Sequence, residues 1–147
     1  MDDPRTPDRS SAPHVAVSNR QDLTVDEPSL AALAERVLAG EGAPEGELSL
    51  SFVSSEEMEQ LHETYSGEAG PTDVLAFPMG EDGLLGDVVI CPAEARRSSD
   101  DLDAELRLLV VHGTLHLLGH DHQDEGDRRK MWRRQELYSG VRLEDER

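Results

Sequence analysis

Histidines gather in one short stretch of the chain. Residues 112–122 read HGTLHLLGHDH and contain four of the six histidines. His112 and His116 are four residues apart, and in a helix this spacing places two side chains on the same face, one turn apart. Two imidazoles arranged in this way can bind one metal ion. The stretch is therefore a candidate metal site.

A third ligand becomes possible because a glycine follows the histidine pair. Gly119 can end a helix, since glycine tolerates the left-handed conformation, and the chain can then turn back toward the ion. His120 and His122 compete for the third position. Histidines at i, i+4 and i+10 with glycine at i+7 match the H-x-x-x-H-x-x-G-x-x-H ligand spacing of metzincin peptidases. This match predicts His112, His116 and His122 as the metal ligands, with His120 beside the site or facing solvent.

The ligand set also indicates the kind of metal. Three imidazoles with an open fourth position are typical of catalytic rather than structural zinc sites. Nickel or copper would also bind such ligands, but neutral imidazoles suit zinc, and we expect one zinc ion per chain. Asp121 and Asp124 either accept hydrogen bonds from ligand imidazoles or simply cap the helix that follows.

The residue after the first histidine limits the chemistry. In zincin peptidases a glutamate at this position is the general base, whereas here it is Gly113, which has no group to accept a proton. Phosphodiester hydrolysis does not need that glutamate, because RNA supplies its own 2′-OH or accepts a metal-activated water. A glycine within a helix costs about 0.5 to 1 kcal/mol relative to alanine. Gly113 therefore indicates close packing or a need for space near the ion.

Composition bounds the class of protein. The 147 residues suffice for one domain with a modest core. The net charge of −18 argues against binding nucleic acid by bulk attraction, so an RNA substrate would need a locally positive site. The basic patch consists of Arg128, Arg129, Lys130, Arg133 and Arg134. These side chains either contact phosphates or form a solvated helix face paired with nearby acids.

The ends of the chain and its single cysteine are less informative. No apolar run approaches the roughly 18 residues that cross a bilayer, and the N-terminus lacks the pattern of a signal peptide. We expect a disordered leader at residues 1–13, a tail at 141–147, no membrane partner and a cytoplasmic location. Cys91 lies in the apolar sequence VVICP and is expected to be a small buried hydrophobe.

Hydrophobic patterning predicts an α+β fold. Strands are predicted at residues 14–18, 47–54, 71–78 and 84–92, and helices at 26–39, 55–65, 98–118 and 124–138. Ser54 and Glu57 have the spacing of a capping box before the second helix. The last two strands are expected to form a hairpin. The prediction is one domain over residues 14–140, with a mixed sheet of about four strands packed with helices and a central, mostly buried metal-binding helix.

Several motifs resemble those of one family. HGTLHLLGHDH resembles the H-G-x-L-H-L-x-G-(Y or F)-D-H signature of the YbeY family, bacterial metal-dependent endoribonucleases of ribosomal RNA maturation. PTDVLAFP at 71–78 resembles the family's P-T-D-V-L-S-F-P, and LLGDVVIC at 84–91 resembles its G-D-I-x-I stretch. VSNRQ at 17–21 is also similar, so the resemblance extends from residue 14 to about 138.

The resemblance implies a zincin-like α+β domain with zinc held at His112, His116 and His122. It implies cleavage of single-stranded RNA, not DNA, at the 3′ end of the 16S rRNA precursor, and a part in ribosome quality control with the small ribosomal subunit. Three positions depart from the family pattern: Ser66 replaces an arginine found in many members, Ala76 replaces serine, and His120 replaces an aromatic residue. The family roles of those positions do not transfer to this chain.

We therefore predict a zinc-dependent endoribonuclease in which a metal-bound water acts as nucleophile or base. The residue that moves protons is not identified by the sequence. Two alternatives remain: a metallohydrolase of peptidase type on the same three-histidine frame, and a non-catalytic ribosome-assembly factor in which zinc only orders the loop at 119–123.

Overall fold

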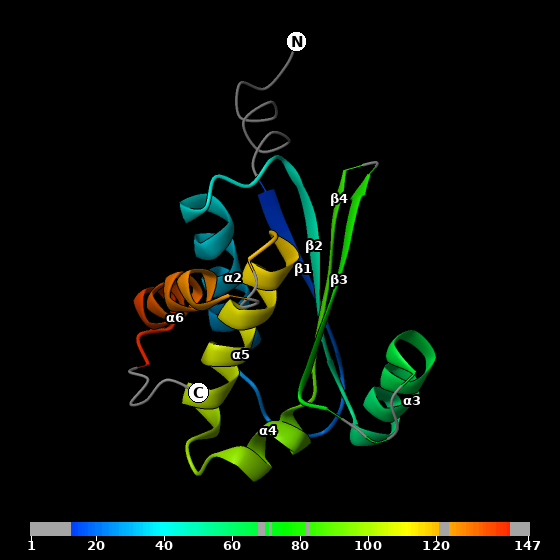
Figure 1. The fold of residues 1–147 in the computed structure, drawn as a ribbon. Coiled ribbons are helices and arrows are strands. Elements are labelled where there is room, and N and C mark those ends of the chain that lie inside the picture. Colours follow the sequence, from blue (N-terminus) through cyan, green and yellow to red (C-terminus); the bar gives the residue numbers. More distant parts are fainter. Residues whose placement is uncertain (1–12, 68–69, 71, 82, 121–123, 142–147) are drawn as a thin grey trace.

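A four-stranded sheet forms the centre of the described part of the chain (Figure 1). The computed structural model describes residues 13–67, 70, 72–81, 83–120 and 124–141. The leader predicted at 1–13 and the tail predicted at 141–147 lie outside the described residues, apart from Pro13 and Val141. His122 and Asp121 also lie outside them. Within the described residues, no helix is both long and apolar enough to cross a membrane.

The sheet is mixed, as predicted. Its strands are β1 (Pro13–Arg20), β2 (Gly46–Val53), β3 (Val74–Glu81) and β4 (Leu84–Ile90), in the order β1-β2-β4-β3. β1, β2 and β4 run parallel, whereas β3 pairs antiparallel with β4 and forms the predicted hairpin. Together with the helices this confirms the expected α+β class.

Alternating side chains give the sheet two different faces. On one face Leu48, Leu50 and Phe52 of β2 are fully buried in the main core. Helices α2 (Glu27–Gly40) and α5 (Leu102–Leu117) cover this face, and α6 (Glu125–Ser139) packs against both of them. On the opposite face α3 (Ser55–Ser66) covers a smaller cluster (Figure 1). Cys91 lies in that cluster with no exposed surface, as predicted.

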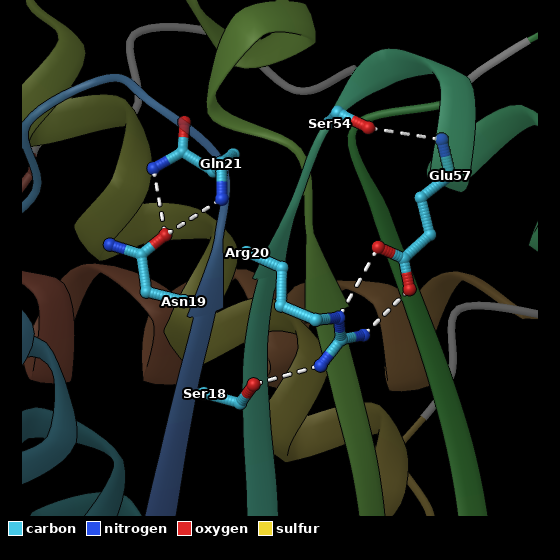
Figure 2. Close-up of polar contacts among 6 residues, drawn as sticks. All are labelled: Ser18, Asn19, Arg20, Gln21, Ser54 and Glu57. Atoms are coloured by element: carbon cyan, nitrogen blue, oxygen red, sulfur yellow. Dashed lines mark hydrogen bonds and ion pairs between the residues drawn. The ribbon is translucent and has the colours of Figure 1, made fainter.

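Side-chain caps fix where the helices begin. Ser54 accepts a hydrogen bond from the Glu57 N–H, and Asp26, Asp101 and Asp124 cap α2, α5 and α6 in the same way. Such a cap contributes about 1 kcal/mol. The Glu57 carboxylate accepts hydrogen bonds from Arg20 at 3.3 and 2.7 Å, while a third Arg20 nitrogen donates to Ser18 (Figure 2). This ion pair joins the end of edge strand β1 to α3.

Two prolines behave differently from the sequence-based expectation. The helix α4 (Pro92–Ser98) was not predicted, because Pro92 ends a strand and also suits the first position of a helix. α5 accordingly begins at Leu102, behind the Asp101 cap, rather than at Ser98. β3 continues through Pro78, where a strand end was expected. It can do so because an edge strand does not need every backbone N–H for pairing.

The central helix α5 lies close against the sheet. It contacts β3 and β4 on one side and α2 and α6 on others, and eight of its residues are buried. At Gly113 an added Cβ would lie 2.7 Å from Val88 Cγ1 and 3.3 Å from Val74 Cγ2. Close packing is therefore the reason for this glycine, and it determines how near α5 lies to β4.

We predict that Gly86→Ala destabilises the fold by about 2 to 4 kcal/mol, the sum of backbone strain and overpacking. Gly86 has φ +147°, and an added Cβ would lie 2.5 Å from both the Phe77 carbonyl oxygen and Leu117 Cδ1. Urea unfolding followed by circular dichroism measures the change. The control Gly126→Ala has its nearest contact at 3.5 Å and should leave stability unchanged or slightly raised. Equal midpoints for Gly86→Ala and the wild type would contradict this close approach.

Candidate metal centre

The two histidines of α5 lie side by side. The ring centroids of His112 and His116 are 4.6 Å apart with an angle of 70° between the ring planes. Both side chains are partly buried, so each ring is held by packing while part of it still faces the surface. The shared helix face predicted from their spacing is confirmed, whereas their role as ligands remains a prediction.

Helix α6 orients the first of these imidazoles. His112 Nδ1 lies 2.5 Å from Gln135 Oε1, and because an amide oxygen only accepts, Nδ1 carries the proton. The unprotonated nitrogen is then Nε2, the form of histidine that binds metal ions. Sequence reasoning missed Gln135. The available signal was its position one turn after Met131, which is buried, because the two residues share a helix face.

The chain turns after α5 where the sequence predicted. Gly119 has φ +100°, in the left-handed region, and the His120 N–H donates to the Leu115 carbonyl at 3.0 Å. The third predicted ligand, His122, follows this turn but lies outside the described residues, as does Asp121. Within residues 13–67, 70, 72–81, 83–120 and 124–141 no group of three metal-binding side chains comes together. Asp124 caps α6, one of the two roles predicted for it.

His120 contacts a carboxylate on another helix. Its Nε2 lies 2.9 Å from Glu41 Oε1, and the Tyr138 hydroxyl donates to Glu41 Oε2 at 2.7 Å. Arg134 Nη1 lies 3.4 Å from the same Oε2. Burial raises the pKa of Glu41, but the hydrogen bonds from Tyr138 and His120 and the charge of Arg134 together outweigh it, so the pKa is lower than usual. This cluster ties the end of α2 to the turn after α5 and to α6.

Two cavities flank the histidine pair. One, of about 340 Å³, lies between α5, α6 and the start of β3, with His112 and Gln135 in its wall. The other, of about 370 Å³, lies along β3 and is lined by His112, Gly113 and His116. His112 therefore lines both cavities, whereas His116 lines only the one along β3.

Gly113, at the position of the zincin glutamate, lies against the core. An added Cβ at Gly113 would meet Val88, which is fully buried. A glutamate there would have to displace α5 from the sheet. The absence of a general base at this position thus follows from the packing of the fold.

The basic residues of α6 fall into three groups. Arg129 pairs with Glu125 at 2.8 Å on an exposed surface, as the solvated-face interpretation predicted, whereas Arg134 lies near the nearly buried Glu41. Arg128, in contrast, lines the 340 Å³ cavity beside His112. Lys130 and Arg133 line a shallower depression on another side of the helix. Among the cavities lined by described residues, only the one beside His112 brings one of these basic side chains, Arg128, next to a histidine of α5.

Comparison with known proteins identifies the family. The family model described as "Endoribonuclease YbeY" matches residues 16–140. The chain belongs to the YbeY family. A curated relative named Endoribonuclease YbeY from Beutenbergia cavernae is 45% identical, with 79% of this chain and 88% of that protein covered. A relative of the same name from Thermobifida fusca is 42% identical, with 90% and 97% covered.

A solved structure has a similar fold. The solution structure of TM1509 from Thermotoga maritima matches with a TM-score of 0.62 and 27% identity, covering 85% of this chain and 86% of that one. The YbeY membership expected from the sequence motifs is thus confirmed, and neither the peptidase nor the non-catalytic alternative is favoured.

The departures from the YbeY pattern can be located in the structure. Ser66 is the exposed last residue of α3, which lies on the face of the sheet opposite α5. Ala76 lines the cavity along β3 that also contains His112 and His116. His120 is held by Glu41. The arginine that many family members have is replaced here by Ser66. Arg128 instead brings a guanidinium to the cavity beside His112.

We predict that Glu41→Gln lowers stability at neutral pH by about 1 to 3 kcal/mol, because it weakens charge-assisted hydrogen bonds at a nearly buried site. The pKa of Glu41 is lower in the folded than in the unfolded chain, so its ionised form stabilises the fold above the ordinary value of 4.5. This contribution is lost as the pH falls below that value. Urea unfolding between neutral and acidic pH should show a shallower acid limb in Glu41→Gln than in the wild type.

The matched control is Glu35→Gln, which changes an exposed carboxylate on the same helix. It should leave both the neutral stability and the acid limb close to those of the wild type. If the two variants behaved alike, the cluster around Glu41 would not have the energetic role that its hydrogen bonds indicate.

Proposed function

We propose that this endoribonuclease uses one zinc ion to cleave single-stranded RNA in the 3′-end maturation of 16S rRNA and in ribosome quality control. The observation that carries the proposal is the pair of neighbouring imidazoles on α5, one of them oriented by Gln135 and lining two cavities. Such a pair is the core of a metal site, and family membership supplies the substrate class.

We assign the ligands as His112, His116 and His122. The donors suit zinc, because two imidazoles lie within one turn of helix and Gln135 accepts a hydrogen bond from His112 Nδ1, the second contact that zinc-binding histidines commonly make. The left-handed turn at Gly119 is compatible with a third ligand from the residues that follow. When bound, such an ion lowers the pKa of a coordinated water and offsets negative charge on phosphate oxygens.

Three residues near the candidate metal centre contribute to the proposal: Gln135, Gly113 and Arg128. Gln135 holds the proton of His112 at Nδ1 and fixes the orientation of the ring. Gly113 supplies no base, so an RNA substrate with its 2′-OH suits the site better than a peptide or DNA. Arg128 lines the cavity beside His112 and brings positive charge to its wall.

The domain bounds, the cellular location and the ribosomal partner are part of the same proposal. The catalytic domain covers residues 14–140, with the leader and tail outside it. The protein acts in the cytoplasm, where it meets the small ribosomal subunit. Its net charge of −18 requires that contact with RNA be local, and Arg128 of α6 lines the cavity beside His112.

Metal content and RNA cleavage should be lost together in His116→Ala. Purified wild-type protein should contain about one zinc per chain by elemental analysis and should cut labelled single-stranded RNA but neither duplex RNA nor casein. A chelator should stop cleavage and added zinc should restore it. His14→Ala, which changes an exposed histidine on β1, should retain both properties.

The alternatives give different results in the same assay. Unchanged metal content in folded His116→Ala would refute the ligand assignment. Chelator-sensitive cleavage of casein would favour the peptidase. A wild-type protein that cuts neither substrate yet co-sediments with small subunits would be the non-catalytic assembly factor.

Gln135→Met should weaken zinc binding by about 10- to 100-fold, the usual effect of removing a hydrogen-bond partner of a ligand histidine. Methionine has a similar size but cannot accept the hydrogen bond from His112 Nδ1 as the amide oxygen does. Competition with a zinc indicator measures the affinity, and the Gln60→Met variant on the exposed face of α3 is the control. Equal affinities for the two variants would show that Gln135 does not position His112.

A further inference from the structure

The cavity between α5, α6 and the start of β3 combines apolar and charged side chains in its lining. Its volume is about 340 Å³, near the lower end of the range for small-molecule sites of about 300 to 1,000 Å³. Half of its lining residues are apolar: Val74, Leu108, Leu109, Met131 and Trp132. His112 and Gln135 line the same cavity, so a molecule bound there lies against the candidate metal centre.

The charged residues of the cavity limit what it can hold. Asp73 and Glu105 bring two carboxylates to the lining, and Arg128 brings one guanidinium. Two carboxylates disfavour a phosphate within the cavity by repulsion. They accept hydrogen bonds from N–H groups, however, including the exocyclic amines of adenine and cytosine. A base inside the cavity can therefore direct its amine toward these carboxylates.

Trp132 adds a flat aromatic surface to this wall. It is the single tryptophan in a chain with only two tyrosines and two phenylalanines, and its side chain is partly exposed at the cavity. Aromatic rings bind unpaired bases by stacking, and such contacts commonly strengthen binding by about 5- to 150-fold. Stacking on Trp132 and hydrogen bonds to the carboxylates thus favour the same ligand.

We propose that this cavity binds one unpaired nucleobase with an exocyclic amine, from a nucleotide adjacent to the phosphate that is cut. The base stacks on Trp132 and directs its amine toward Asp73 and Glu105. This inference rests on the proposed endoribonuclease function and adds a preference for adenine, cytosine or guanine over uracil at one position. A paired base cannot enter a cavity of this size without leaving its helix, which gives a physical basis for cleavage of single strands.

Fluorescence of Trp132 provides a direct test, because the chain has no other tryptophan. The zinc-loaded protein is titrated with short 2′-O-methyl oligonucleotides of adenosine, cytidine or uridine, which cannot be cleaved through the 2′-OH. Adenosine and cytidine oligomers should quench the fluorescence and bind at least about fivefold more tightly than uridine oligomers. Equal affinities for all three, or no change in fluorescence on binding, would overturn the proposal.

Variants separate stacking from hydrogen bonding. Trp132→Ala should weaken adenosine and cytidine binding, measured by anisotropy of labelled oligonucleotides, by about 5- to 150-fold, and Trp132→Phe should retain most of the affinity. Asp73→Asn combined with Glu105→Gln should abolish the preference over uridine. Leu137→Ala, an exposed position elsewhere on α6, is the control and should bind as the wild type does. Circular dichroism verifies that each variant is folded.

Failure of this inference is distinguishable from failure of the proposed function. Cleavage of RNA by the wild type with no effect of Trp132→Ala on affinity or on base preference at the cut site would reject the cavity as a base site and retain the nuclease. Base-selective quenching without any RNA cleavage would retain the base site and reject the nuclease. Quenching by inorganic phosphate alone would show that the cavity binds anions and would overturn the proposal.

Discussion

The close contact between Gly113 and Val88 is the constraint on which the rest of the site depends. It allows α5 to lie directly on β4, and α5 carries both His112 and His116. The same contact leaves no room for a side chain at the position where a zincin peptidase has its general base. One packing requirement thus positions the imidazoles and removes one route to peptide hydrolysis. The candidate chemistry follows from how tightly a helix and a sheet fit together.

Contacts between α6 and its neighbours give the histidines different roles. Gln135 accepts a hydrogen bond from His112 Nδ1, while Glu41 contacts Nε2 of His120. Tyr138 and Arg134, also on α6, hold Glu41 in turn. The two histidines therefore have different surroundings, because each ring meets a different acceptor. α6 is the element that makes this distinction.

The features predicted from the sequence were those fixed by local geometry. The shared face of His112 and His116 follows from helical periodicity, and the turn at Gly119 follows from the conformational freedom of glycine. Gln135 and Glu41 were missed because they lie 23 and 79 residues from the histidines they contact, and no periodicity records such pairs. Continuation of β3 through Pro78 depended on its place at the sheet edge, which the sequence did not reveal.

The strong negative charge of the chain has a consequence for how it can recognise RNA. Long-range attraction is weak for a protein of net charge −18, so binding energy must come from contacts at short range. Stacking and hydrogen bonds to a base act at short range and depend little on net charge. Carboxylates beside the candidate metal centre would repel a phosphate. They can, however, accept hydrogen bonds from the amine of a base that enters the cavity. An acidic endoribonuclease is therefore expected to select its substrate by accessible bases, and accessible bases are what distinguish single strands from duplexes.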